Sequence, residues 1–467
     1  MNYSDSERIE TYLKKLGHKK ASTQAKADLI IFNSCSVKQK AEDKVIGSME
    51  KLITRKRKNP NLLIALTGCM VRKSSTKADE KKDRDHFIKI LKHLDIAFRI
   101  EDLPKLRTLL EKSQQHQGIS AQTQPSTEPQ IPEEELEDYF HISPSHASKA
   151  QVFIPVSTGC DKFCTYCIVP FSRGREVSRD LKQILKEATE AVEQGAFEIT
   201  LLGQTVDSYG LSNLDRKNRL FNYDKIDAGT QAPPFVQLLE TLDKLHAKGL
   251  RRLRFTSPHP KDVSPELIES YAKLKTLMPH IHLPIQSGSN TVLKRMNRPY
   301  TVERFREIVT ALRKAKPGIS ITTDMIIGFC GETEEEFQET LDLYKELQFD
   351  FCYSSRYSNR KGTHADKHLP DDVPPKTKAK RWHQLNTLLM ETAQTKYDAM
   401  IDQEVEILVE NRTERSSSSG AINKNLLRGK TPHNQTVEIL KDQAITGTLQ
   451  KVRITKTGKC VALGEMV

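Results

Sequence analysis

The chain of 467 residues has no long apolar run. No stretch approaches the ~20 consecutive apolar residues that a membrane-spanning helix needs. The first ten residues, MNYSDSERIE, lack the basic block and the apolar block of a secretory signal peptide. These two absences exclude the usual signals for a membrane or secreted protein, and we expect a cytoplasmic protein with no membrane partner.

Cysteines are few and unevenly placed. A cytoplasmic chain with eight cysteines in this length is not expected to carry a disulfide framework. Cys352 and Cys460 lie in apolar, strand-like surroundings and are predicted to be inert thiols. Only three cysteines cluster, Cys160, Cys164 and Cys167, in the stretch TGCDKFCTYCIVPFSRGREVSR.

Acidic residues are fewer than basic ones, because the chain has 61 Asp and Glu and 73 Lys and Arg, which gives a net charge of +12. Such a balance favours a polyanionic partner such as nucleic acid, although a solvated basic surface would give the same number. From residue 411 onward, ten Lys or Arg residues stand against four acids, which suits a surface for a phosphate backbone.

Hydrophobic patterning divides the chain into four parts. Residues 1–112 alternate helices and buried strands, residues 113–148 are an acidic, Pro-bearing flexible linker, residues 149–399 repeat strand and helix, and residues 400–467 are short strands. The predicted fold class is α/β: an N-terminal parallel α/β domain, a central βα barrel, complete or partial, and a C-terminal all-β barrel. Six barrel strands are predicted, in AQVFIPVST, EITLLG, RRLRFTS, HIHLPIQ, ISITTDMIIGF and FDFCYSSRY.

Two further cysteines end buried strands of the N-terminal part. The segments ADLIIFNSC and LLIALTGC deliver Cys35 and Cys69 at the carboxyl ends of their strands. In parallel sheets, ligands gather beyond those ends. The pair is therefore predicted to face one crevice and to bind a ligand together.

The three clustered cysteines follow the pattern Cys-x3-Cys-x2-Cys. Zinc usually takes four ligands from two paired knuckles, and no second knuckle is evident, although a distant completion stays open. A [4Fe–4S] cluster normally takes one thiolate per iron, so three thiolates leave one iron open for a substrate or cofactor. The spacing therefore favours such a cluster.

Several motifs together resemble one family. They are GCDKFCTYCIVPFSRGREVSR, LLGQTVDSYG, RFTSPHP, HLPIQSGSNTVLKRMNR, DMIIGFCGETEEEF and NSCSVKQKAEDKV. The chain resembles, over essentially its whole length, the radical S-adenosylmethionine (SAM) methylthiotransferases of the MiaB type. The resemblance implies a radical SAM barrel, a C-terminal TRAM domain that grips RNA, and addition of a methylthio group to C2 of N6-isopentenyladenosine at position 37 of tRNA.

The resemblance also implies cofactors and residue roles. Cys160, Cys164 and Cys167 would hold the radical [4Fe–4S] cluster, and Cys35 and Cys69 would hold a second cluster that supplies sulfur. SAM would serve as methyl donor and as radical source. The residues expected to lie near bound SAM are Tyr166, Gly203, Gln204, Gln286, Ser287, Asp324, Gly328 and Glu332. Substrate contact is a further expectation for Arg254, His259 and His282, each of which would equally suit a buried polar role.

The sequence departs from the family at two places. The family's first N-terminal cysteine, which lies in GCQMN, has no counterpart, and the chain begins at the methionine of that motif. We expect that the start codon was assigned too late. As printed, the chain has an incomplete ligand set for the second cluster. Cys330 replaces the proline of the family's Gly-Phe-Pro-Gly-Glu pattern, and we expect a tolerated change and no ligand role.

The expected partners are tRNA, a reductant such as flavodoxin or ferredoxin, and a sulfur donor system, with the chain acting as a monomer. Two alternatives stay open. The substrate of a methylthiotransferase could be threonylcarbamoyl-adenosine in tRNA or an aspartate of a ribosomal protein. The chain could also be a non-enzymatic iron–sulfur protein that binds RNA.

Overall fold

The computed structural model describes most of the chain. The described residues are 1–36, 39–72, 93–116, 138–146, 148–211, 232–410, 426–440, 442, 444–458 and 460–467. Most of the predicted linker, residues 117–137, lies outside them. The chain divides into two compact units, the first made of Met1–Ala147, Ser157–Phe163 and Cys167–Gln183, and the second of Ser148–Val156, Cys164–Tyr166 and Ile184–Val467.

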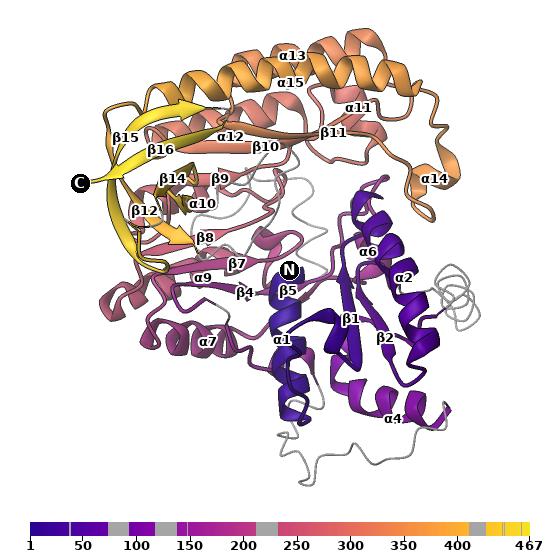
Figure 1. Cartoon of the computed structure of the whole chain (residues 1–467). Helices are drawn as coiled ribbons and strands as arrows, with labels where there is room; N and C mark the ends of the chain where they lie inside the picture. The colour runs from indigo at the N-terminus through magenta and orange to yellow at the C-terminus, as the bar shows by residue number, and fades with distance from the viewer. Residues whose placement is uncertain are drawn as a thin grey trace. The chain divides into compact units, whose positions relative to one another are not determined.

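A three-stranded parallel sheet organises the first unit, in the order β1-β2-β3 (Figure 1). The central strand β2 is buried along its whole length, because its alternate side chains pack on opposite faces. Leu63 and Ala65 belong to an apolar cluster with residues of α1 and α4, and Ile64 and Leu66 to one with residues of α2. The elements are α1 (Asn2–Lys15), β1 (Leu29–Ser34), α2 (Gln39–Lys58), β2 (Leu63–Gly68), β3 (Ile96–Ala97) and α4 (Leu106–His116).

Residues just before the barrel differ from the expected flexible linker. Tyr139, Phe140 and Ile142 are buried in the same apolar cluster as α1 and α4. They include a short 3-10 helix, Tyr139–His141, capped by the Asp138 carboxylate. This end of the predicted linker is therefore packed structure, because three large apolar side chains find a core to enter.

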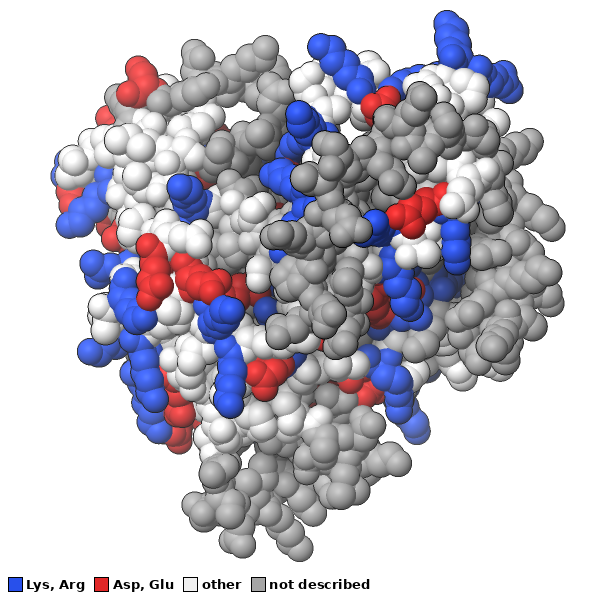
Figure 2. Space-filling model, turned by 90° about the horizontal axis from the view of Figure 1, so that it is seen from below, with Lys and Arg blue, Asp and Glu red and all other residues white. Residues whose placement is uncertain are grey.

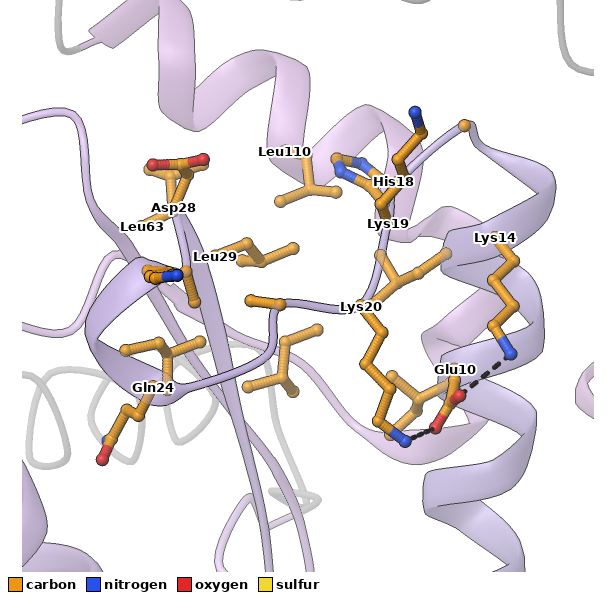
Figure 3. A pocket seen from close by; sticks show the side chains of 18 of the residues that line it. Glu10, Lys14, His18, Lys19, Lys20, Gln24, Asp28, Leu29, Leu63 and Leu110 are labelled. Atoms are coloured by element: carbon orange, nitrogen blue, oxygen red, sulfur yellow. Dashed lines mark hydrogen bonds and ion pairs between the residues drawn. The ribbon is translucent and has the colours of Figure 1, made fainter. Parts of the chain in front are cut away.

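A pocket of about 1220 Å³ lies in the first unit beside β1 (Figure 3). Side chains of α1, of the loop that follows it and of β1 line this pocket. The Glu10 carboxylate there accepts from the Lys14 and Lys20 ammonium groups at 2.9 and 2.8 Å. None of its described lining residues is a cysteine, so this cavity is separate from the predicted chemistry.

Six parallel strands form the central part of the second unit and confirm the six predicted barrel strands. They make two sheets, in the orders β4-β7-β8 and β11-β10-β9. Helices surround these strands (Figure 1). A large apolar cluster packs between the strands and the helices. The strands are β4 (Gln151–Pro155), β7 (Glu198–Leu202), β8 (Arg252–Phe255), β9 (His280–His282), β10 (Ser320–Ile327) and β11 (Phe351–Arg356).

Amphipathic helices connect the barrel strands, as the periodicity predicts. Hydroxyl side chains cap several of them, and α13 carries a capping box in which Thr333 and Glu336 bond each other's backbone N–H groups. The helices are α7 (Leu181–Glu193), α9 (Pro234–Asp243), α10 (Pro265–Lys273), α11 (Asn290–Arg295), α12 (Val302–Ala315), α13 (Glu334–Leu347) and α15 (Pro375–Asp398). None of the helices within the described ranges is both long and apolar enough to cross a membrane.

The C-terminal part is a closed five-stranded barrel, as the short strands predict. Its strand order is β12-β13-β14-β16-β15. One of its strands, β13, lies in LLRGK, which the sequence pattern did not indicate. The strands are β12 (Glu404–Glu410), β13 (Leu426–Lys430), β14 (Thr436–Leu440), β15 (Leu449–Gly458) and β16 (Val461–Met466).

Two buried arginines of β8 join this small barrel to the large one within the second unit. Arg252 donates to the carbonyl oxygens of Lys430 and Glu406, at 2.7 and 3.2 Å. Arg254 donates to the carbonyl oxygens of Pro432 and Thr431, at 3.0 and 2.9 Å. Removing the C-terminal strands would therefore leave two buried guanidinium groups without these partners, at a cost of several kcal/mol.

Candidate functional site

The cysteine-bearing loop begins at a tight turn that only glycine fits. Gly159 has a φ of +81°, and an added Cβ would lie 2.1 Å from the Arg175 carbonyl oxygen. The next residue, Cys160, is buried, and its N–H donates to the Gly174 carbonyl at 3.2 Å. The loop is thus folded back on the segment after α6 (Val169–Ser172), within the first unit.

Cys164 is fixed by residues of the second unit. The Arg298 guanidinium donates through Nη1 to Cys164 Sγ at 3.4 Å, through Nη2 to the Pro284 carbonyl at 2.7 Å and through Nε to the Tyr300 hydroxyl at 2.7 Å. Burial raises the pKa of Tyr300 to about 12, so the phenol stays protonated at neutral pH. Sequence reasoning missed Arg298, because nothing in the spacing of RMNRPY indicates which side chain turns toward a cysteine.

The cysteine loop is divided between the two units, with Cys160 and Cys167 in the first and Cys164 in the second. Within the described parts of the chain, no three His, Cys, Asp or Glu side chains are gathered so that they could hold a metal ion. The donor chemistry fits an iron–sulfur cluster, because three thiols stand in eight residues and one already accepts from a buried cation. These residues remain candidate ligands on that chemistry.

Most of the predicted SAM-binding residues follow barrel strands, whereas Asp324 lies within β10. Gly203 and Gln204 follow β7, and Gln204 Oε1 is buried with no hydrogen-bond partner in the described structure. Gln286 adopts a φ of +78°, which is uncommon for a residue with a side chain, and bonds the Asp324 carbonyl through its N–H at 2.9 Å. An unsatisfied amide oxygen and a strained residue at strand ends suit a ligand-binding rim.

Other predicted SAM-binding residues make structural contacts. Ser287 is buried and lies 3.3 Å from the Thr340 hydroxyl of α13. The Glu332 carboxylate accepts from the Gly328 N–H at 2.8 Å and from Arg381 of α15 at 3.0 Å. Burial raises the pKa of Glu332 to about 7, against the opposing effects of these two donors. Glu332 thus ties the loop after β10 to a helix, and its role toward SAM stays a prediction.

Aromatic and histidine side chains line the same end of the strands. Tyr166 meets the Phe329 ring edge-on at 6.2 Å between centroids. His282 contacts Thr322 Oγ1 at 3.0 Å and Asp324 Oδ2 at 3.2 Å. Asp324 keeps about a third of its side chain exposed, so His282 and Asp324 form a polar pair that a ligand can reach.

The remaining residues singled out in the sequence have other surroundings. Arg254 serves the junction between the barrels, which accounts for it without substrate. The His259 N–H donates to both Asp207 carboxylate oxygens at 2.9 Å. Cys330 is buried in a small apolar cluster, and burial raises the pKa of its thiol, as suits the inert residue expected there. Cys352 is buried on β11, whereas Cys460 lies half-buried in a turn.

The strands of the first unit bring Cys35 and Cys69 to one edge of the sheet. In the parallel register Ser34 pairs with Gly68, so the two cysteines follow at equivalent positions. The Cys69 N–H donates to the Ser34 carbonyl at 2.8 Å. An added Cβ on Gly68 would lie 2.6 Å from that carbonyl oxygen, which explains the glycine. Cys35 and Cys69 thus follow adjacent strand ends, and their shared role as ligands stays a prediction.

Comparison with known proteins identifies the family. The model of the radical SAM superfamily matches residues 154–344, and that of the uncharacterized protein family UPF0004 matches residues 1–89. A tRNA-2-methylthio-N(6)-dimethylallyladenosine synthase from Moorella thermoacetica is 36% identical over 100% of this chain and 96% of its own length. The chain belongs to this synthase family.

A second synthase of the same name, from a Thermoanaerobacter species, is also 36% identical, over 100% of this chain and 90% of its own. Among solved structures, the cobalamin-dependent SAM radical enzyme OxsB has a TM-score of 0.48 and 15% identity over 84% of this chain and 53% of that one. Membership in the synthase family makes the chain a radical SAM enzyme, and its cofactors include SAM and an iron–sulfur group.

Proposed function

We propose that the chain replaces the hydrogen at C2 of N6-dimethylallyladenosine at position 37 of tRNA with a methylthio group. The observation that carries this proposal is the three-thiol loop inside the region that matches the radical SAM superfamily, in a chain that matches named synthases along its whole length. The C2–H bond breaks, a C–S bond forms, and the methyl group comes from SAM.

Radical chemistry suits this substrate. An aromatic C–H bond is neither acidic nor polar enough for acid–base attack. SAM held beside a reduced [4Fe–4S] cluster would supply the radical chemistry that removes this hydrogen, with 5′-deoxyadenosine as the by-product. The chain's own contribution is to hold Cys160, Cys164 and Cys167 as cluster ligands and to bind SAM at the strand ends.

The second cysteine pair supports a separate sulfur site. Cys35 and Cys69 lie side by side at the sheet edge of the first unit. Thiolates are the usual ligands of iron–sulfur groups, and these two are proposed to hold the second [4Fe–4S] cluster, which provides the sulfur. The reductant, the sulfur donor and a monomeric state belong to the same proposal.

The C-terminal barrel supports the RNA partner. Lys451 and Lys456 are exposed on β15. On the face that Figure 2 shows, Lys and Arg side chains lie among Asp and Glu side chains. For RNA binding, the proposal therefore relies on local groups of basic residues and not on a uniformly positive face. Replacing Lys451 and Lys456 with Glu should weaken tRNA binding and lower its salt dependence by about one unit of slope per lysine.

The test is anaerobic reconstitution with iron and sulfide, followed by SAM and a strong reductant. Production of 5′-deoxyadenosine, measured by chromatography with mass detection, is expected only with the reductant and only with all three loop cysteines. A fully reconstituted chain that binds RNA but never forms 5′-deoxyadenosine would instead be a non-enzymatic iron–sulfur protein.

A further inference from the structure

Tyr353 lies on β11, the last strand of the large barrel, and its aromatic ring is exposed. Among the large apolar and aromatic side chains of the six barrel strands, all of which lie in described ranges, Tyr353 alone is exposed, at 50%. Two rings meet it edge-on: that of Phe351 at 4.9 Å and that of His282 at 5.6 Å between centroids. These neighbours hold the ring while half of its surface stays available to a ligand.

Strand register places Tyr353 beside the polar pair of His282 and Asp324. Asp324 of β10 pairs with Tyr353, and Thr322, two residues earlier, pairs with His282 of β9. Paired residues of neighbouring strands, and residues two apart in one strand, share a face of the sheet. The opposite face packs against the helices through members of the large apolar cluster, among them Ile281, Met325 and Cys352. The exposed ring and the polar pair therefore lie together on the face away from those helices.

The chemistry of this face suits an adenine base with an apolar substituent. Asp324 Oδ2 lies 3.2 Å from His282 Nε2, and about a third of the Asp324 side chain is exposed. An ionised carboxylate only accepts hydrogen bonds, and an adenine with one N6 substituent keeps one N6–H donor. The Tyr353 ring offers an apolar surface on which a base or a hydrocarbon group can pack.

The same face disfavours a substituent that carries a carboxylate. Asp324 would place a like charge beside it, which is unfavourable in a partly desolvated site. Arg254, the basic side chain of β8, has other partners, because its Nε lies 3.1 Å from Glu198 Oε2 and its two Nη atoms donate to backbone carbonyls. A dimethylallyl group is uncharged, whereas a threonylcarbamoyl group carries a carboxylate. The charge on this face therefore distinguishes the two candidate nucleosides.

We propose that Tyr353 and Asp324 are specificity-determining residues that read the N6 substituent of the target adenosine. The Tyr353 ring packs on the dimethylallyl group, and the Asp324 carboxylate excludes an acidic substituent. This inference rests on the proposed function and assigns its substrate preference to two side chains. Asp324 is also expected near SAM, and one residue can border both molecules because hydrogen transfer requires SAM and the nucleoside to meet.

The experiment compares binding of three anticodon stem-loop RNAs that differ only at the target nucleoside. They carry dimethylallyladenosine, adenosine or threonylcarbamoyl-adenosine, and fluorescence anisotropy measures their affinities for the reconstituted full chain at fixed salt, without reductant. Tyr353→Ala should weaken binding of the dimethylallyl RNA about tenfold and leave the adenosine RNA within about twofold. Tyr353→Phe keeps the ring and should match the parent. Asp324→Asn should raise the affinity for the threonylcarbamoyl RNA, relative to the dimethylallyl RNA, about tenfold.

Tyr3→Ala is the matched control, because Tyr3 of α1 is exposed to nearly the same extent, 49%. It should leave the ratios between the three affinities unchanged. Equal losses for the dimethylallyl and adenosine RNAs in Tyr353→Ala, or an unchanged preference in Asp324→Asn, would overturn the inference, because a purely structural role lowers all affinities alike. A parent chain that makes the methylthio product yet binds all three RNAs equally would overturn the inference alone. A parent chain that makes 5′-deoxyadenosine but no methylthio product from the dimethylallyl RNA would refute the proposed function, and the inference with it.

Discussion

Arg298 and Arg173 each contact a cysteine sulfur in the described part of the chain, and their remaining hydrogen bonds differ. Arg298 donates to Cys164, a carbonyl and a phenol, and none of its nitrogens lacks a partner in the described structure. Arg173 donates to Cys69 and a carboxylate and keeps Nη1 unpaired. Every nitrogen of the Arg298 guanidinium thus has a partner within the protein, whereas Arg173 leaves one buried nitrogen without a partner among the described residues.

The thiols of the two sites are also brought together in different ways. The radical loop carries three thiols within eight residues, so spacing alone predicts shared ligation. Cys35 and Cys69 are 34 positions apart and meet only because their strands pair in parallel and in register. Sequence spacing brings the radical-loop thiols together, whereas strand pairing brings Cys35 and Cys69 together. Substituting one set of cysteines should therefore disable that site and leave the other.

The largest effect is expected at the radical loop. Changing Cys160, Cys164 and Cys167 together to Ala should abolish 5′-deoxyadenosine formation and remove the iron that these thiols hold, because no other thiol set has this spacing. Iron analysis measures the iron content, and the SAM cleavage assay measures the formation of 5′-deoxyadenosine. SAM cleavage by the triple variant at the parent rate would refute the assignment of the loop.

Removing the N-terminal thiol pair should separate formation of the methylthio product from formation of the radical. Changing Cys35 and Cys69 to Ala should eliminate the methylthio product while SAM cleavage stays within about twofold, because the radical ligands are intact. Nucleoside analysis of treated tRNA and the cleavage assay measure the two outcomes. Full methylthio product from this variant would show that sulfur reaches the adenosine without the N-terminal pair.

A smaller effect is expected from Arg298→Lys. A lysine ammonium cannot satisfy the thiol, the carbonyl and the phenol with one planar group, and losing one charged hydrogen bond costs about 1.5–3 kcal/mol. The rate of SAM cleavage should fall by about tenfold or more. Arg295→Lys, three residues away and paired with Glu336, is the matched control and should stay near the parent rate. Equal rates of SAM cleavage in the Arg298→Lys and Arg295→Lys variants would show that Arg298 has no specific role in the reaction.

The smallest effect concerns stability and pH. Because burial raises the pKa of Glu332 to about 7, the protonated carboxyl is favoured in the folded chain. Its stabilising contribution is present below the unfolded pKa of 4.5 and is lost as pH rises through about 7. Between about pH 5 and about pH 8, parent stability should fall relative to Glu332→Gln by on the order of 3 kcal/mol.

Urea unfolding of the apo protein at several pH values measures this difference. The comparison of slopes matters more than the absolute stability, because Gln also changes the contact with Arg381. Parallel pH dependence of the parent and the Gln variant would show that Glu332 does not titrate in this range.

The sequence predicted what local pattern can encode. The elements with strong hydrophobic periodicity were predicted, and the structure contains all of them. They are the six barrel strands together with β1, β2, α1 and α2 of the first unit. The strand β13 was missed because LLRGK is short and lacks alternation, and β3 because it has only two residues. Tyr139, Phe140 and Ile142 were assigned to a linker because their acidic, Pro-rich neighbours hid three apolar residues.

Side-chain roles were less predictable than strands. Arg254 was expected either to contact substrate or to serve a buried polar role, and the structure shows bonds to Thr431 and Pro432, which lie 177 and 178 positions away in the chain. Arg173 and Arg298 lie in the motifs that carry the resemblance, but only the folded chain shows which sulfur each one reaches. Long-range contacts of this kind leave no local spacing to detect.

The central claim is methylthio transfer to C2 of dimethylallyladenosine. The reconstituted chain, SAM and reductant are incubated with tRNA that carries this nucleoside or, in a parallel arm, threonylcarbamoyl-adenosine, and the digested nucleosides are analysed by mass spectrometry. The account predicts that dimethylallyladenosine gains one methylthio group in place of one hydrogen, and that the other arm stays unchanged. Methylthio product only in the threonylcarbamoyl arm, or in neither arm while 5′-deoxyadenosine accumulates, would contradict it.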